Sequence, residues 1–147
     1  MPNISIPPDV FIKTSLKPGT VYYFPEESFS SKESHYFVVL NRNPLDEHII
    51  LLVCSQSHIE KVKQRRKTCP PETLVEISKT QYPSFTTNSI IDCNYVLEKT
   101  VAQLMDKYAQ GKLQLILEPI KDEMVERLRK AVLLSPRIEP RIKNILK

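Results

Sequence analysis

HYFVVLN (residues 35–41) and HIILLVC (residues 48–54) are two apolar segments joined by the polar stretch RNPLDE (residues 42–47). Both have the length of a strand and are rich in β-branched and aromatic residues, which favour strands. The Asn-Pro pair and the aspartate between them are typical turn residues, so the three segments together predict an antiparallel hairpin. Apolar residues follow one another in both segments instead of alternating with polar ones. This pattern indicates that other elements cover both faces of the sheet.

The rest of the chain extends this hairpin into a larger sheet followed by helices. Further strands are expected at residues 20–24 (TVYYF), 73–77 (TLVEI), 89–96 (SIIDCNYV) and 113–117 (LQLIL). Apolar residues recur at helical spacing within residues 101–108, 120–132 and 142–146. Five short strands followed by helices, with one more strand inserted, predict an α+β fold. We expect a small, strongly bent antiparallel β-barrel with helices on its outer face.

The chain has 147 residues, which is the size of one domain. We expect a single domain over residues 1–147 with three parts: a proline-rich N-terminal arm (1–16), a barrel with an inserted helix (17–118) and C-terminal helices (119–147). Residues 1–16 lack the continuous apolar stretch of a signal peptide, and no apolar run approaches the ~20 residues that cross a bilayer. Three widely spaced cysteines without a C-x-x-C pair indicate reduced thiols. We therefore expect a cytoplasmic protein without a membrane partner.

Positive charge is concentrated in two segments. The chain carries a net charge of +4, while residues 57–67 hold five basic side chains against one acidic, and residues 121–147 hold eight against four. Clustered charge raises the local potential and attracts anionic partners. The C-terminal share accompanies an apolar helical face and indicates the solvent side of packed helices. The basic segment 57–67 (SHIEKVKQRRK) favours either a phosphate-binding surface or a solvated stretch with no specific role.

Several classes of chemistry are excluded or disfavoured by the composition. Two glycines are too few for a phosphate-cradling P-loop or a dinucleotide-binding fingerprint. The three histidines, His35, His48 and His58, have neither the spacing nor the neighbouring carboxylates of a metal site. The G-x-S-x-G turn of serine hydrolases is absent, and Cys54 and Cys93 lie inside apolar strands. We therefore expect neither a metal nor another cofactor.

A candidate site forms where the hairpin ends. His35 begins one strand and Ser55 follows the end of its partner, so both are expected at the same rim of the sheet. Gln56, Ser57 and the basic segment leave from that rim, which predicts one shallow groove. Histidine exchanges protons near neutral pH, and hydroxyls and cations stabilise phosphorane charge, so this set can cleave RNA through the ribose 2′-hydroxyl without a metal. The alternative is an ordinary surface histidine beside an ordinary polar loop.

RNA contacts are expected from charges and rings next to this rim. The candidate phosphate contacts are Lys61, Lys63, Arg65, Arg66 and Lys67. Tyr82 and Phe85 belong to a polar loop, residues 78–88, and are expected to be exposed for stacking on bases. Single-stranded nucleic acid is bound in this way, because its phosphates meet cations and its bases stack on aromatic rings.

The segments PGTVYYF (18–24), HYFVVLN and HIILLVCSQS (48–57), in this order, are similar to the opening of the PemK/MazF-like toxin family. SIIDCN (89–94), followed by a helix and a short strand, resembles the later part of that fold, so the resemblance covers about residues 17–118. It implies an SH3-like barrel with helices, a homodimer and metal-independent cleavage of single-stranded RNA. It also implies neutralisation by a small antitoxin bound in the active groove.

The resemblance assigns roles to individual positions. His35 stands where the family has a catalytic arginine, Ser55 matches its catalytic Thr or Ser, and Thr20 replaces the aspartate of its opening turn. Arginine stabilises charge but hardly releases a proton, whereas histidine is the better base. The leading hypothesis is a toxin-like endoribonuclease with His35 as general base or acid and Ser55 as phosphate stabiliser. The alternatives are a non-catalytic RNA- or protein-binding module on the same fold and an immunity-type protein that binds an acidic protein surface.

Overall fold

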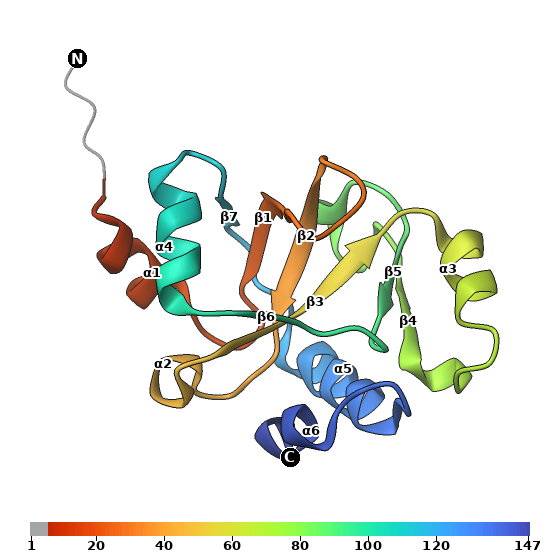
Figure 1. Ribbon diagram of the computed structural model, residues 1–147. Coiled ribbons are helices and arrows are strands. Elements are labelled where there is room, and N and C mark those ends of the chain that lie inside the picture. Colours follow the sequence, from red (N-terminus) through yellow and green to blue (C-terminus); the bar gives the residue numbers. More distant parts are fainter. Residues whose placement is uncertain (1–5) are drawn as a thin grey trace.

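The computed structural model describes residues 6–147, and the first five residues of the expected N-terminal arm lie outside this range (Figure 1). Most of the remaining arm is helical, since α1 spans Pro8–Ser15. Proline suits the first position of a helix, because the N–H that it lacks would have no helical partner there and its fixed φ is helical. Ile12 is fully buried, so the arm packs as part of the domain.

Seven antiparallel strands form one sheet. They are β1 (Val21–Pro25), β2 (Ser34–Val39), β3 (Ile50–Gln56), β4 (Leu74–Ile77), β5 (Ser89–Asp92), β6 (Leu97–Lys99) and β7 (Gln114–Ile116). The order across the sheet is β4-β5-β3-β2-β1-β7, and β6 pairs with the first half of β3. The predicted α+β class is confirmed. Within residues 6–147 no pairing joins the two end strands, β4 and β7, so the sheet is not closed into a barrel.

The predicted hairpin is present as β2 and β3, with Val38 opposite Val53. The connection between them holds a one-turn helix, α2 (Pro44–Glu47), where the sequence predicts a turn. Asn41 closes the hairpin: its Oδ1 accepts a hydrogen bond from Leu51 N at 3.1 Å, and its Nδ2 donates to Ile49 O at 2.6 Å. A buried amide that satisfies backbone groups in this way stabilises the point where the two strands part.

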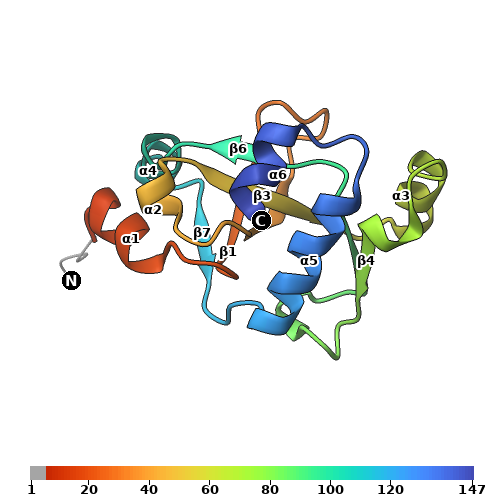
Figure 2. The same ribbon diagram turned by 90° about the horizontal axis from the view of Figure 1, so that it is seen from below.

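Helices cover both faces of the sheet, as the uninterrupted apolar strands predict (Figures 1 and 2). On one face α5 (Asp122–Leu134) and α6 (Pro140–Leu146) pack against a core that includes Val38 and Val53. On the other face α1 and α4 (Val101–Ala109) pack against a core that includes Phe37 and Cys54. The two cores take alternate residues of the same strands, because successive side chains of a strand point to opposite faces.

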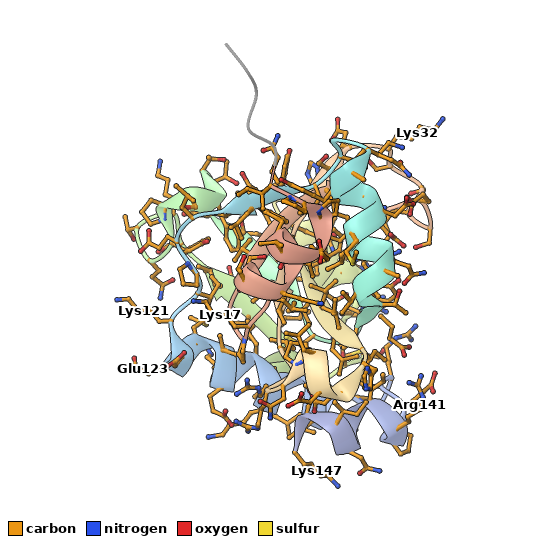
Figure 3. The ribbon with its side chains drawn as sticks, turned by 90° about the vertical axis from the view of Figure 1, so that its left-hand side faces the viewer. Lys17, Lys32, Lys121, Glu123, Arg141 and Lys147 are labelled. Atoms are coloured by element: carbon orange, nitrogen blue, oxygen red, sulfur yellow. The ribbon has the colours of Figure 1, made fainter. Side chains whose placement is uncertain are left out.

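α1 and α4 lie side by side on that second face (Figure 3). Phe11 and Tyr108 stack between them, with ring centroids 4.0 Å apart and an interplanar angle of 6°. α4 begins with a capping box, in which Thr100 Oγ1 accepts from Gln103 N and Gln103 Oε1 accepts from Thr100 N. This exchange satisfies two N–H groups at the start of the helix and explains why α4 begins after Thr100.

The segment before α5 is tied to the start of β1. Ile120 N donates to Gly19 O at 2.8 Å, and Gly19 N donates to Val39 O at 2.9 Å. These bonds hold the chain extended up to Lys121, so α5 begins at Asp122, slightly later than the apolar spacing predicts. Gly19 therefore joins β1, β2 and the C-terminal helices at one point.

The remaining helical segments are short. α3 (Ile59–Arg65) carries much of the basic segment and lies at the edge of the molecule beyond β4 and β5 (Figure 1). The two 3-10 turns are η1 (Pro71–Thr73) and η2 (Pro83–Phe85). None of the helices described within residues 6–147 combines the length and the apolar character needed to cross a membrane.

Candidate functional site

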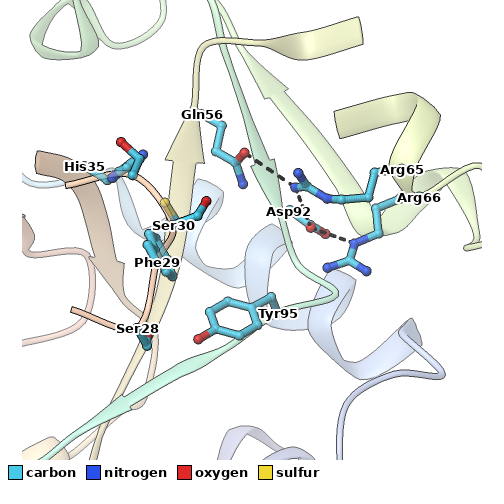
Figure 4. Close-up of a pocket in the computed structure, with 11 residues that line it drawn as sticks. Ser28, Phe29, Ser30, His35, Gln56, Arg65, Arg66, Asp92 and Tyr95 are labelled. Atoms are coloured by element: carbon cyan, nitrogen blue, oxygen red, sulfur yellow. Dashed lines mark hydrogen bonds and ion pairs between the residues drawn. The ribbon is translucent and has the colours of Figure 1, made fainter. Parts of the chain in front are cut away.

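A cavity of about 430 Å³ opens on the sheet face that carries His35 of β2 and Cys54 and Gln56 of β3 (Figure 4). The loop between β1 and β2, the end of β3, the end of α3 and the turn after β5 form its walls. Its lining residues are Ser28, Phe29, Ser30, Ser31, His35, Cys54, Gln56, Arg65, Arg66, Asp92 and Tyr95. The cavity thus brings together His35, Gln56, Arg65 and Arg66, four of the residues that the sequence predicts for a site.

Two arginines at the end of α3 are anchored on one buried carboxylate (Figure 4). Arg66 Nε donates to Asp92 Oδ2 at 2.8 Å, and Arg65 Nη2 lies 3.5 Å from the same oxygen. Arg65 Nη2 also donates to Gln56 Oε1 at 3.4 Å. Arg66 therefore uses only Nε, and its two Nη groups have no partner among residues 6–147. Two guanidinium charges against one carboxylate leave one net positive charge in this part of the cavity.

Asp92 is held in place from the core side. Its Oδ1 accepts from both the backbone N and the Nδ2 of Asn94 at 3.0 Å. Asn94 in turn donates to Thr73 Oγ1 at 2.8 Å and accepts from Ser135 Oγ at 2.7 Å. Asp92 is only 2% exposed, so its charge is stabilised by these donors and by the arginines. The network makes Asp92 a positioning residue for Arg65 and Arg66.

His35 is half-buried in the wall opposite the arginines. Its ring meets the edge of Phe29, with centroids 5.4 Å apart and an interplanar angle of 79°. Its Nδ1 is buried and has no hydrogen-bond partner within residues 6–147. A buried nitrogen without a partner is uncommon in folded proteins.

Ser55 does not join His35 in the cavity, and the expected convergence of the two side chains is wrong. They share the rim of the sheet, because Ser55 is paired with Tyr36, the neighbour of His35. Successive residues of a strand point to opposite faces, so Ser55 points to the face opposite His35, where it is 5% exposed. The same alternation places Gln56 on the face of His35. Ser57 is exposed beyond the end of β3 and does not line the cavity.

The predicted phosphate contacts divide into two groups. Arg65 and Arg66 line the cavity, whereas Lys61, Lys63 and Lys67 do not. All three lysines are exposed, and Lys63 Nζ lies 3.2 Å from Glu76 Oε2 on β4. A short helix spreads neighbouring side chains around its axis, so one basic segment cannot present all of its charges to one cavity.

Tyr82 and Phe85 are buried in the core, and the prediction that they are exposed is wrong. The Tyr82 hydroxyl donates to Glu118 O, and the Phe85 ring lies 5.2 Å from that of Tyr36. Burial raises the pKa of Tyr82 to about 12. The polar composition of residues 78–88 predicts an exposed loop. Large aromatic side chains are nevertheless stabilised by burial, and these two pack into the core.

Phe29 and Tyr95 are the rings that line the cavity instead. Sequence reasoning missed both, together with Asp92. Phe29 is the one aromatic residue in a polar loop between two strands, a signal that could have been used. The sequence predicts a strand over residues 89–96 that includes Tyr95, but β5 ends at Asp92 and Tyr95 follows the turn at Cys93 and Asn94.

The thiol at the base of the cavity is not a nucleophile. Burial raises the pKa of Cys54 to about 12, and the nearby Asp92 carboxylate adds to the rise while Arg65 opposes it. The thiol is therefore protonated at neutral pH, and it is the thiolate that reacts. Within residues 6–147, no group of three or more His, Cys, Asp and Glu side chains is arranged to hold a metal ion.

Comparison with known proteins gives no assignment for this arrangement. No protein-family model matches the chain, and no curated protein matches it.

Proposed function

We propose that this chain is a toxin-like endoribonuclease that cleaves single-stranded RNA without a metal. One observation carries the proposal: His35 lines the same cavity as Arg65 and Arg66. A proton-transfer group beside phosphate-binding cations is the set that cleavage through the ribose 2′-hydroxyl requires.

In the proposed reaction the ribose 2′-oxygen attacks the adjacent phosphorus, and the bond from phosphorus to the 5′-oxygen breaks. The products are a 2′,3′-cyclic phosphate and a 5′-hydroxyl. His35 performs one of the two proton transfers, removing the proton of the 2′-hydroxyl or protonating the leaving 5′-oxygen, and solvent water performs the other. The Nη groups of Arg66 stabilise the phosphorane charge. Ser55 has no direct role in this version, and the serine hydroxyls that line the cavity are those of Ser28, Ser30 and Ser31.

The finer parts of the proposal rest on the resemblance to PemK/MazF-like toxins. We assign the sheet to their SH3-like fold. We also propose that the protein is a cytoplasmic homodimer and that a small antitoxin neutralises it. The assignment is supported by the order in which α4 and β7 follow the first six strands, which agrees with a helix and a short strand after SIIDCN. An acidic antitoxin segment would pair with Arg65 and Arg66.

The test is cleavage of matched RNA substrates in the presence of EDTA. The protein should cleave single-stranded RNA at least ~100-fold faster than the same sequence with 2′-O-methyl groups, because a methylated 2′-oxygen has no proton to lose. Denaturing gel electrophoresis measures both rates. Equal cleavage of the two substrates, or cleavage of neither, would contradict the proposal.

A second candidate function is binding of RNA without cleavage. It is favoured by the position of Ser55, which leaves the cavity with fewer of the groups that the family uses. This function and the first share the phosphate contacts of Arg65 and Arg66. They differ in whether the bound RNA remains intact.

The salt dependence of RNA binding tests the phosphate contacts in either case. Replacing Arg65 and Arg66 with glutamine should reduce the slope of log K against log salt by about 1.4, since each phosphate contact on a single strand contributes about 0.7. The matched control replaces Lys61 and Lys67, which are exposed outside the cavity, and should change the slope less. Fluorescence anisotropy measures the slopes, with circular dichroism to verify folding. Equal changes in the two double variants would show that the cavity is not the RNA site.

A further inference from the structure

Tyr95 presents an aromatic surface at the mouth of the cavity. It follows the turn after β5 and is 39% exposed, although its ring is large and mainly apolar. Figure 4 shows its ring lying across the cavity below Phe29. An exposed aromatic ring beside a cavity wall is available for stacking on a planar group.

Phe29 connects this exposed ring to the candidate proton-transfer group. Its centroid lies 6.0 Å from that of Tyr95 and 5.4 Å from that of His35. It also lies 5.9 Å from Phe37 in the core, and its backbone N donates to Glu26 O at 3.1 Å. Phe29 and Tyr95 are too close, at a tilt of 59°, to admit a base between them. Phe29 therefore packs on one side of the Tyr95 ring, and a base would stack on the other, exposed side.

Arg66 supplies the second half of the arrangement. Its side chain is 13% exposed and is oriented by the bond from Nε to Asp92, while both Nη groups remain without a partner in the described residues. A guanidinium held in this way binds an anion such as a phosphate with two parallel N–H groups. The cavity volume of about 430 Å³ falls within the range of ~300–1,000 Å³ typical of small-molecule sites.

From these observations we infer that the cavity binds one nucleotide unit of RNA, with its base stacked on Tyr95 and its phosphate on Arg66. The inference rests on the proposed function for the choice of RNA, and it adds Tyr95 as the residue that positions the base. A peptide of aspartate and glutamate would satisfy Arg66 but has no aromatic ring to stack on Tyr95. A nucleotide satisfies both, and the hydroxyls of Ser30 and Ser31 on the cavity wall can donate to its polar edges.

Isothermal titration with matched small probes tests this inference. Adenosine 5′-monophosphate carries a base, ribose 5-phosphate carries the same phosphate and sugar without one, and an acidic peptide represents the competing partner. The base should increase affinity roughly 5- to 100-fold, since stacking on one aromatic ring has an effect of this size. Titration up to ~1 mM covers the affinity expected for such probes.

Two variants locate the base contribution. Tyr95→Phe should retain it, because the ring remains, whereas Tyr95→Leu should bind both phosphate probes with equal affinity. Tyr95 is partly exposed, so both variants should fold, and thermal unfolding verifies this. Unchanged base contribution in Tyr95→Leu, no binding of the nucleotide, or stronger binding of the acidic peptide would overturn the inference.

The outcome is separable from that of the proposed function. Cleavage of RNA with no base contribution at Tyr95 would overturn the inference and leave the ribonuclease proposal standing. Nucleotide binding that depends on Tyr95, without cleavage of RNA, would support the inference and favour the binding module over the enzyme.

Discussion

Replacing His35 with alanine is expected to lower the rate of RNA cleavage by roughly 10²- to 10⁴-fold, the usual contribution of a positioned general acid or base. The reason is that His35 is the one histidine among the residues that line the cavity. The substitution removes a nitrogen that is already unsatisfied, so stability should change little through hydrogen bonding. The loss should fall on the rate at saturating RNA, with RNA affinity nearly unchanged, because phosphate binding belongs to Arg65 and Arg66.

His58 provides the matched control for this substitution. It is exposed at the start of α3 and does not line the cavity, so His58→Ala should cleave RNA at the wild-type rate. Added imidazole should restore part of the activity of His35→Ala, since a small molecule can occupy the vacated space and exchange the proton. Equal rates for wild type and His35→Ala would remove His35 from the mechanism. Equal losses in both histidine variants would point to a general effect on folding.

Replacing Gly19 with alanine is expected to reduce the free energy of unfolding by about 4 kcal/mol. The backbone there has φ of +88°, and a Cβ atom would lie 2.6 Å from the carbonyl oxygen of Ile120. The left-handed conformation costs an alanine about 1–2 kcal/mol, and the remainder comes from the backbone shift that the contact forces. The shift would disturb the bonds from Ile120 N to Gly19 O and from Gly19 N to Val39 O. Urea unfolding measures the change.

Gly111 separates the conformational part of this effect from the steric part. Its φ is +72°, but a Cβ atom would have no neighbour within 4 Å. Gly111→Ala should therefore cost only about 1–2 kcal/mol, the price of the left-handed conformation alone. If the two variants lose equal stability, the close approach of Gly19 to the segment before α5 is not what makes glycine necessary there.

The hairpin could be predicted from residues 35–54 because its signals are local. Strand propensity, turn residues and the absence of alternation act within a few residues of one another, and they also indicated correctly that both faces are covered. The alternation of strand side chains alone could not place Ser55 relative to His35, because the answer also depends on the register that pairs Ser55 with Tyr36. Closure of the sheet could not be read locally, because it depends on whether β4 and β7 meet, and these strands are far apart in the chain.

The residues that line the cavity are brought together by contacts between distant parts of the chain, unlike the residues of the hairpin. Asp92 reads as part of an apolar strand, and nothing near it indicates that Arg66, 26 residues earlier, donates to it. The sequence predicts that Tyr82 and Phe85 are exposed loop residues. In the structure they are buried, with Phe85 against Tyr36 and the Tyr82 hydroxyl bonded to Glu118 O. Phe29 and Tyr95 face the cavity because two separate turns meet there.

Local patterns alone were thus sufficient for the α+β class, the hairpin, the covered faces of the sheet and the rim that holds His35. Only the tertiary structure decided that the sheet remains open, that Ser55 faces away from His35, and that Arg65 and Arg66 are the cations that share its cavity. The physical reason is that propensity and periodicity act through neighbours in the chain. Which side chains converge on a cavity depends on how elements that are distant in the sequence pack together. Local patterns contain no information about that packing.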